Sequence, residues 1–318
     1  MSTPADRATP DRTGPDRTGL GPERAEPAAA PPASAPAPRR AADGYRPGRT
    51  LPLRVELIRQ LKRRRTLVMG AVLVALPFVL LLAFRLGGGP RGNPDRVSLM
   101  DTATVSGANF AAVNLFAAAG FLLVVPVALF CGDTVASEAN WSSLRYLLAA
   151  PVPRARLLWS KLVVALGLSA AAIALLPLTA LAVGTAAYGW GPLRLPTGGA
   201  LAADTAVARL ALAAAYVFVS QLVTAALAFW LSTRTDAPLG AVGGAVGLTI
   251  IGNVLDEVTA LGDWRELLPA HWQYAWLDAL APRLETAGML QGASLSLSCA
   301  LVLTALAFRG FARKDVVS

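Results

Sequence analysis

The sequence predicts an all-α membrane protein with six transmembrane helices and an amphipathic helix before the first of them. Hydrophobic residues make up 54% of its 318 residues and the mean hydropathy is +0.51. Charged residues make up only 15%, against about 25% in soluble proteins. Most basic residues border apolar runs, as in membrane proteins, and are not interleaved with aromatic residues. The net charge of +9 therefore indicates membrane topology and not nucleic-acid binding.

Two segments precede the apolar part of the chain. Residues 1–50 contain ten prolines and eleven alanines but no Val, Ile, Phe or Trp, so we expect a disordered cytoplasmic tail. In residues 51–66, Leu53, Leu57 and Leu61 recur every four residues beside a basic cluster. This pattern is typical of an amphipathic helix at an anionic membrane surface. A positive flank without a defined helix is the alternative.

A permease-like domain of six spans is expected over residues 67–309, followed by a short tail at 310–318. A helix that crosses the bilayer needs about 20 apolar residues. Gln221 is the one strongly polar residue near the middle of a run, and we expect it to hydrogen-bond to a neighbouring helix. The six runs cover about 67–86, 109–131, 160–184, 205–231, 238–255 and 289–308.

The distribution of Lys and Arg predicts the orientation of these spans. With both termini on one side, that side receives 15 basic residues within 20 residues of the spans, and the other side receives five. The positive-inside rule then places both termini in the cytoplasm. It also places residues 136–161, between the second and third spans, on the cytoplasmic side.

Two features outside that loop are candidates for packing and for membrane contact. The fifth span contains small residues four apart, which allow close helix packing in lipid, either within the chain or between chains. The aromatic-rich stretch 256–288 predicts short interfacial helices on the external side, with an ordinary loop as the alternative. The candidate packing residues are Gly240, Gly243, Gly244 and Gly247, and the candidate interfacial residues are Trp264, Trp272 and Trp276.

The loop between the second and third spans predicts a short amphipathic helix from Glu138 to Leu148. Trp141, Leu144 and Leu148 share one face at helical spacing. Pro151 and Pro153 end the helix, and Arg154 places positive charge at the membrane edge. Such a helix suits a docking element for a partner protein, although a surface helix without a partner has the same periodicity.

This loop resembles the ABC-2 type permeases of ATP-binding-cassette transporters. The resemblance rests on an acidic residue, two small polar residues, Leu-x-x-Leu-Leu, Pro-Val-x-Arg and a following lysine. It covers residues 51–318, including the basic helix and the six spans. The residues that carry it are Glu138, Ser142, Ser143, Leu144, Leu147, Leu148, Pro151, Val152, Arg154 and Lys161. The residues that it implies couple the loop to an ATPase are Glu138, Trp141, Ser142, Ser143, Leu144, Leu148, Pro151, Arg154 and Lys161.

The resemblance implies a transmembrane subunit that exports its substrate and binds no cofactor itself. No G-x-x-x-x-G-K-[ST] motif occurs in the sequence, so a separate ABC ATPase subunit would bind the ATP. A second permease subunit, identical or different, would complete the pathway. The excess of Arg over Lys, together with many alanines, suggests a bacterial plasma membrane protein.

Three other functions compete with this hypothesis. An intramembrane enzyme needs paired catalytic groups, but His271 is the only histidine and accompanies no candidate nucleophile. A secondary transporter or channel usually has an ionisable group or a broken helix at mid-membrane. No ionisable group is evident there, although Pro77, Pro126 and Pro177 could bend their helices. A membrane assembly factor that does not transport is the third.

Overall fold

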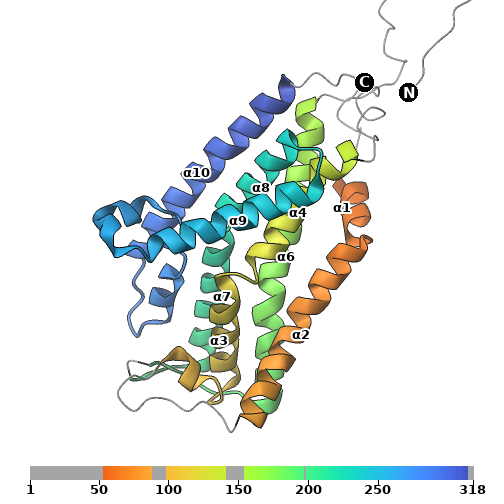
Figure 1. Ribbon diagram of the computed structural model, residues 1–318. Helices are drawn as coiled ribbons and strands as arrows, with labels where there is room; N and C mark the ends of the chain where they lie inside the picture. The colour runs from red at the N-terminus through yellow and green to blue at the C-terminus, as the bar shows by residue number, and fades with distance from the viewer. Residues whose placement is uncertain (1–52, 88–97, 141–153, 197, 314–318) are drawn as a thin grey trace, which may run out of the picture. The chain divides into compact units, whose positions relative to one another are not determined.

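The computed structural model describes residues 53–87, 98–140, 154–196 and 198–313. The expected tail at 1–50 and most of the expected loop helix lie outside these ranges. The described part is mostly helical (Figure 1). Its α-helices are α1 (Leu53–Leu61), α2 (Arg64–Leu86), α3 (Gly107–Ala119), α4 (Val124–Asn140), α6 (Arg154–Tyr188), α7 (Ala203–Ser220), α8 (Leu222–Arg234), α9 (Pro238–Asp256) and α10 (Ala287–Ala312).

The apolar helices match the expected membrane spans. Among the described residues, five helical segments are long and apolar enough to cross a membrane, with α7 and α8 forming one of them. The bent pair α3 and α4 makes a sixth if it is counted as one span. Each of the six apolar runs falls within one of these segments. The longest, α6, extends beyond its run at both ends, from Arg154 to Tyr188.

The second span is bent where α3 gives way to α4. The axes of the two helices differ by 52°. Pro126 lies in the first turn of α4, where its missing N–H cannot continue a helical ladder from α3. The N–H of Leu123 instead donates to the carbonyl of Ala118, five residues back, at 2.9 Å. Gly120 lies beside this bend, and a Cβ there would lie 2.4 Å from the hydroxyl of Tyr274, so a larger residue would displace that side chain.

The fourth span has a milder irregularity at Gln221. This residue separates α7 from α8, yet its N–H and carbonyl still bond to Val217 and Ala225. Its side-chain Nε2 donates to the carbonyl of Ala119 at 3.2 Å. The expectation that Gln221 bonds to a neighbouring helix is therefore confirmed, and its partner is the end of α3.

The main contacts between helices form two groups. The first joins α8 to α4 and α10, and the second joins α3 and α2 to α6. In the second, Gly184 of α6 lies so close to Phe110 of α3 that a Cβ would come within 2.8 Å of the Phe110 Cβ. Small residues at such crossings allow close approach, which is the main source of helix association in lipid.

The glycines expected to mediate packing in α9 contribute little to it within this chain. A Cβ at Gly243 or Gly247 would meet no atom within 4 Å. Gly240 has ordinary contacts at 3.6 Å or more, and Gly244 alone is tight, 3.1 Å from a methyl group of Leu231. The close approach of α9 to α4 instead uses Gly132, whose Cβ would lie 3.3 Å from the backbone nitrogen of Val242. At this crossing, the small residue that allows close approach therefore lies on α4 and not on α9.

The segment between α9 and α10 forms two 3₁₀ helices, η3 (Thr259–Leu267) and η4 (Ala275–Leu280). Trp264 is 73% exposed, which suits the expected interfacial position, and Trp272 is half-buried. Trp276 is completely buried, so the expectation that it faces the lipid headgroups is wrong. Its ring lies in the core because η4 packs against α7 and α10.

A short hairpin of β1 (Leu193–Arg194) and β2 (Ala200–Leu201) lies between α6 and α7. The side-chain amide of Asn109 in α3 hydrogen-bonds to both backbone groups of Arg194. Its Nδ2 donates to the carbonyl at 2.8 Å, and its Oδ1 accepts from the N–H at 2.9 Å. The sequence did not indicate these strands because two residues are too few for a periodic pattern. A third 3₁₀ helix, η2 (Leu99–Thr102), precedes α3.

The glycine contacts generate a matched pair of predictions. Gly184→Ala should destabilise the protein by about 1–3 kcal/mol, because Phe110 is fully buried and must move. Gly243→Ala should be neutral or stabilising by up to about 1 kcal/mol, since the methyl group enters open space and alanine favours helix. Thermal unfolding of the two purified variants in one detergent measures both. Equal losses would contradict the described packing of α3 on α6.

Candidate functional site

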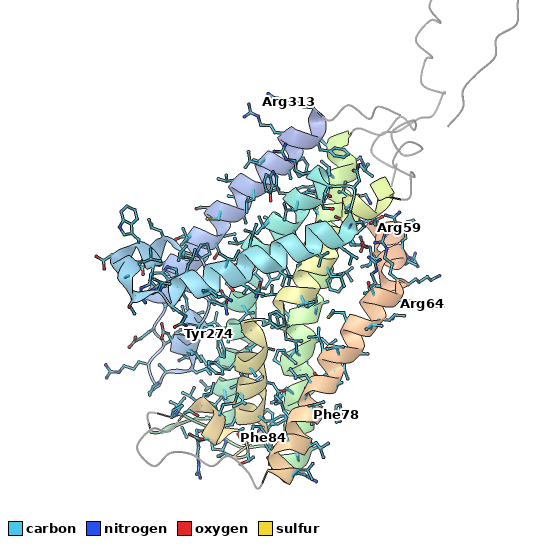
Figure 2. The ribbon with its side chains drawn as sticks, in the orientation of Figure 1. Arg59, Arg64, Phe78, Phe84, Tyr274 and Arg313 are labelled. Atoms are coloured by element: carbon cyan, nitrogen blue, oxygen red, sulfur yellow. The ribbon has the colours of Figure 1, made fainter. Side chains whose placement is uncertain are left out.

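Charged side chains from four helices meet beside the ends of the 141–153 segment. They form what we call the ionic cluster, in which every acidic member has at least one basic partner. In Figure 2, Arg59 lies where α1 meets the end of α4, whereas Arg64 points away from the helices. The members of the cluster are Glu56 and Arg59 of α1, Arg63 between α1 and α2, Arg65 of α2, Asp133 and Glu138 of α4, and Lys161 of α6.

Lys161 and Glu138 form the buried centre of the ionic cluster. The Lys161 Nζ lies 2.6 Å from the Glu138 Oε1, and the two side chains are 2% and 3% exposed. Nζ also donates to the carbonyl of Thr134 at 3.2 Å and lies 3.6 Å from Glu56. Ionised groups this deeply buried are tolerated only when they are paired and hydrogen-bonded. Lys161 therefore joins the start of α6 to α4 and α1.

The rest of the ionic cluster ties the start of the chain to α4. Arg59 lies 2.5 Å from Glu138 and 2.7 Å from Glu56. Asp133 is paired with Arg63 and, at 2.8 Å, with Arg65. The Thr66 hydroxyl donates to the carbonyl of Gln60 at 2.8 Å, which closes the turn from α1 into α2. Both acidic side chains of α4 are thus held by arginines of the α1–α2 region.

Helix α1 turns its polar side inward and its apolar side outward. Glu56 and Gln60 are 7% and 2% exposed, and they bond to each other at 3.1 Å. An exposed apolar face and a buried polar face are the reverse of a water-soluble arrangement. Lipid is the solvent that suits such a face. The apolar residues of α1 are 38–57% exposed: Leu53, Val55, Leu57, Ile58 and Leu61.

The neighbouring charges determine the pKa values of Glu56 and Arg59 in α1. Burial alone would raise the pKa of Glu56, but the charges of Lys161 and Arg59 outweigh burial and bring that pKa below its ordinary 4.5. Burial likewise opposes the charge of Arg59, and Glu56 and Glu138 more than offset it, so the pKa of Arg59 is raised. Both side chains are therefore held in their charged forms.

Ser232 extends these connections to α8. Its Oγ accepts hydrogen bonds from the N–H groups of Val135 and Ala136 at 3.1 and 2.9 Å. It is 1% exposed. The stretch of α4 from Asp133 to Glu138 is therefore fixed by α1, α6 and α8 together, and α8 in turn packs along α10.

This geometry gives the 141–153 segment two fixed ends. Glu138 lies in the last turn of α4, which ends at Asn140, and Lys161 lies in the second turn of α6, which begins at Arg154. The ion pair between these two side chains joins the residues that flank the segment on its two sides. Arg59 and Glu56 connect the same pair to α1.

The expected site residues fall into two groups. Glu138 and Lys161 are expected to belong to the ATPase-coupling loop, and the structure places both inside the chain, where each is the other's counter-ion. Glu138 also belongs to the end of a span and not to the start of a loop helix. Arg154 begins α6. The remaining expected residues lie outside the described ranges: Trp141, Ser142, Ser143, Leu144, Leu148 and Pro151.

Several members of the ionic cluster were not recognised from the sequence as site residues. Arg59 and Arg63 belong to the basic cluster of residues 51–66, which is expected at an anionic membrane surface, and no role is predicted for Asp133 from the sequence. One signal was available, since Asp133 and Glu138 are the only acidic residues between Asp101 and Asp204. Acidic groups at the end of an apolar run, preceded in the chain by a dense basic segment, indicate ion pairing between the two.

Comparison with known proteins identifies the larger part of the chain. A family model described as "ABC-2 family transporter protein" matches residues 53–234. The match begins with the first residue of α1 and ends with the last residue of α8. It thus contains the ionic cluster, Ser232 and the 141–153 segment. No curated protein matches the chain significantly.

The buried centre of the ionic cluster generates a stability prediction. Lys161→Met should cost about 3–5 kcal/mol, because it leaves Glu138 buried without its lysine partner. Adding Glu138→Gln should restore part of the loss, since the buried carboxylate that has lost its lysine partner is then replaced by a neutral amide. Arg65→Gln, at a side chain that is 56% exposed, should cost at most about 1 kcal/mol. Thermal unfolding of the four purified proteins tests this, and a Lys161→Met variant as stable as Arg65→Gln would refute it.

The lowered pKa of Glu56 generates a pH prediction. Undocked α1 would bind a proton at the ordinary pKa of 4.5, and docked α1 only at a lower pH. Ionised Glu56 therefore stabilises docking above pH 4.5, and this contribution is lost as the pH falls through the lowered pKa.

Hydrogen exchange of residues 53–61, corrected for intrinsic rates, should show protection that is constant from pH 7 to 5 and falls below 4.5. The Glu56→Gln variant should show weaker protection and no such step. Protection already lost at pH 5.5 in the unmodified protein would contradict the assignment.

Proposed function

Because this chain belongs to the ABC-2 family of transporter proteins, we propose that its 141–153 segment couples ATP hydrolysis in a separate subunit to movement of the membrane helices. Family membership and the apolar helices make the chain a multi-pass membrane protein and a membrane permease of an ABC transporter. Such a context includes a partner ATPase. The proposal concerns how the ATPase transmits force to this chain.

The observation that carries the proposal is the buried Lys161–Glu138 pair. An ATPase that pushes on a loop moves membrane helices only if the loop ends cannot yield independently. The ion pair holds those ends together at 2.6 Å, and α1 braces both through Arg59 and Glu56. The 141–153 segment would supply the contact with the ATPase, and the ionic cluster would transmit the resulting motion to α4 and α6.

The same proposal fixes the orientation of the chain. The 141–153 segment and both termini would face the cytoplasm of a bacterial cell, whose plasma membrane the helices cross, in agreement with the distribution of Lys and Arg. Helix α1 would lie at the cytoplasmic membrane surface, with its exposed apolar face in the lipid. Its buried polar face would remain on the ionic cluster.

In the proposed cycle, ATP brings two ATPase subunits together and displaces the 141–153 segment of each permease subunit. Helices α4 and α6 then tilt together, and the pathway between two permease subunits, identical or different, opens to the outside. The direction proposed is export. ATP would be bound by the partner, so this chain would itself catalyse no reaction and hold no cofactor.

One observation favours a different transport mechanism. The α3–α4 pair is bent by 52° inside the membrane-spanning part, and interrupted helices line the binding sites of ion-coupled carriers. Collapse of the proton gradient at constant ATP separates the two mechanisms. It abolishes transport by a carrier, whereas it leaves transport by the proposed ATP-driven permease intact.

Substitutions in the loop and in the ionic cluster should have different consequences. Leu148→Asp should abolish coupling of ATP hydrolysis to transport while thermal stability stays unchanged, because the proposal assigns this side chain to the contact with the ATPase. Glu138→Gln should reduce both coupling and stability, since it weakens the buried pair. ATP hydrolysis and transport in proteoliposomes that contain the complete complex, together with thermal unfolding, measure these effects.

A matched control is Leu267→Asp, the same change at a leucine that is 61% exposed at the end of η3. In the proposed orientation this residue lies on the opposite side of the membrane, so coupling should be normal. Normal coupling in Leu148→Asp, or equal loss in Leu267→Asp, would refute the proposed role of the segment.

A further inference from the structure

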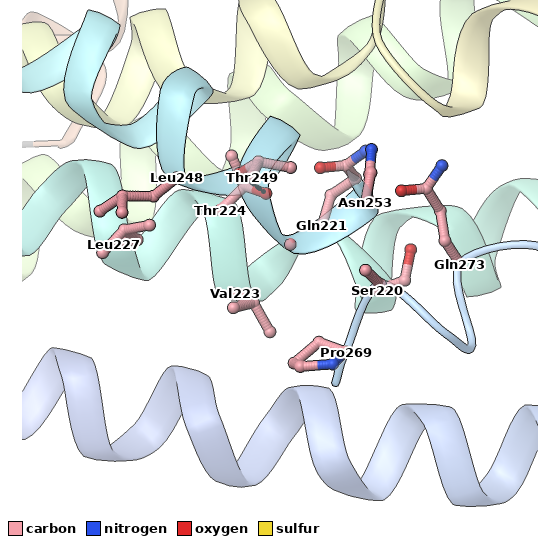
Figure 3. Close-up of a pocket in the computed structure, with 12 residues that line it drawn as sticks. Ser220, Gln221, Val223, Thr224, Leu227, Leu248, Thr249, Asn253, Pro269 and Gln273 are labelled. Carbon is pink, nitrogen blue, oxygen red and sulfur yellow. Dashed lines mark hydrogen bonds between the residues drawn. The ribbon is translucent and has the colours of Figure 1, made fainter. Parts of the chain in front are cut away.

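A second candidate site lies away from the ionic cluster, beside the two helix interruptions. It is a cavity of about 120 Å³ bordered by the α7–α8 junction, the second half of α9 and the segment after η3 (Figure 3). At roughly 30 Å³ per water, this is room for about four water molecules or one small organic group. Gln221 is separated from the end of α8 by about 20 Å of helix, at 1.5 Å per residue. The cavity therefore lies at membrane depth.

The cavity has a hydrogen-bonding end and an apolar end. Figure 3 shows the amides of Gln221, Asn253 and Gln273 at one end, and Leu227 with Leu248 at the other. Between them, the hydroxyls of two threonines bond to each other at 3.2 Å and bridge α8 to α9. These threonines are Thr224 and Thr249. The two ends call for a ligand that is itself part polar and part hydrocarbon.

At the hydrogen-bonding end of the cavity, some amide donors and acceptors have no partner within the described part of the chain. Gln221 and Asn253 donate to the carbonyls of Ala119 and Gly120, at 3.2 and 3.4 Å, which leaves their amide oxygens available. Within the described part of the chain, the side-chain amide of Gln273 forms no hydrogen bond, and its atoms are not among the buried unpaired ones, so they are accessible from the cavity that this residue lines. The donor and the acceptor of this amide are therefore available to a ligand that enters the cavity.

The residues that line the cavity determine which ligand charge it can accept. Every lining residue is uncharged, so a charged group that entered would lose its hydration without gaining a counter-ion. Asp256, Glu257 and His271 line an adjoining cavity of about 320 Å³ and not this one, and Asp256 and His271 are paired with each other at 2.7 Å. The two cavities share Asn253, Ala270 and Gln273.

We propose that this cavity binds the polar end of an uncharged amphipathic molecule, an amide or a diol attached to a hydrocarbon chain. Such a group both donates and accepts, as the amides of Gln273 and Gln221 require, and its first carbon atoms contact Leu227 and Leu248. The site goes beyond the coupling function, because binding requires neither the ATPase nor ATP.

The test uses the full-length protein in phosphatidylcholine nanodiscs and native mass spectrometry of the released protein. Four probes with the same 12-carbon chain are compared: dodecanamide, 1-monolauroylglycerol, laurate and dodecylamine. The neutral pair should be retained as one copy per chain, and the charged pair should remain at the background of non-specific adducts. Retention of all four to the same extent would overturn the proposal.

Variants locate the binding. Gln273→Leu should weaken binding of the neutral probes roughly fivefold, the factor that one lost hydrogen bond commonly costs. Gln291→Leu is the matched control at an exposed glutamine of α10 and should bind normally. Gly252→Leu fills the cavity, since a Cβ there points towards the Ala270 Cβ at 3.8 Å, and should abolish binding without altering any amide. Unchanged binding in Gly252→Leu would overturn the proposal even if Gln273→Leu failed to fold.

Discussion

The ion pair between Lys161 and Glu138 is the interaction on which the arrangement of α1, α4 and α6 depends. It places two opposite charges, each almost completely buried, between the helices that flank the 141–153 segment. Neither charge could stay there alone, because desolvation would be uncompensated. The pair also draws in α1, whose Glu56 and Arg59 contact both partners. Electrostatic complementarity thus positions helices whose apolar faces have little preference between lipid and one another.

In the middle of the described helices, the polar side chains are uncharged amides and hydroxyls. The helix interruptions expose the carbonyls to which these side chains hydrogen-bond. The bend at Gly120 leaves carbonyls that Gln221 and Asn253 approach from two other helices. A polar group within lipid must find its partner inside the protein. The interruptions and the amides therefore depend on each other, and together they leave a cavity that suits an uncharged ligand.

Hydropathy predicted the helices because about 20 consecutive apolar residues have one stable form in lipid. Contacts between helices were harder to predict. Gly243 and Gly247 have the spacing of a packing motif but face open space, because such a motif does not identify the helix that would fill it. The same limit applies to charge. Arg59 could contact lipid or a carboxylate, and only the fold brings Glu138, far away in the sequence, within 2.5 Å of it. Trp276 was misplaced because an aromatic residue suits a core as well as an interface.

The central claim is that the ionic cluster makes α1 and the start of α6 move together. Pulsed electron paramagnetic resonance tests it directly, with spin labels at Ile58 and Trp159, which are 41% and 59% exposed, and a third at Leu301 of α10. Cys131 and Cys299 would first be replaced. When ATP is trapped in the complete complex, the 58–159 distance should stay constant while both labels move relative to 301. A changed 58–159 distance, or no movement relative to 301, would contradict the account.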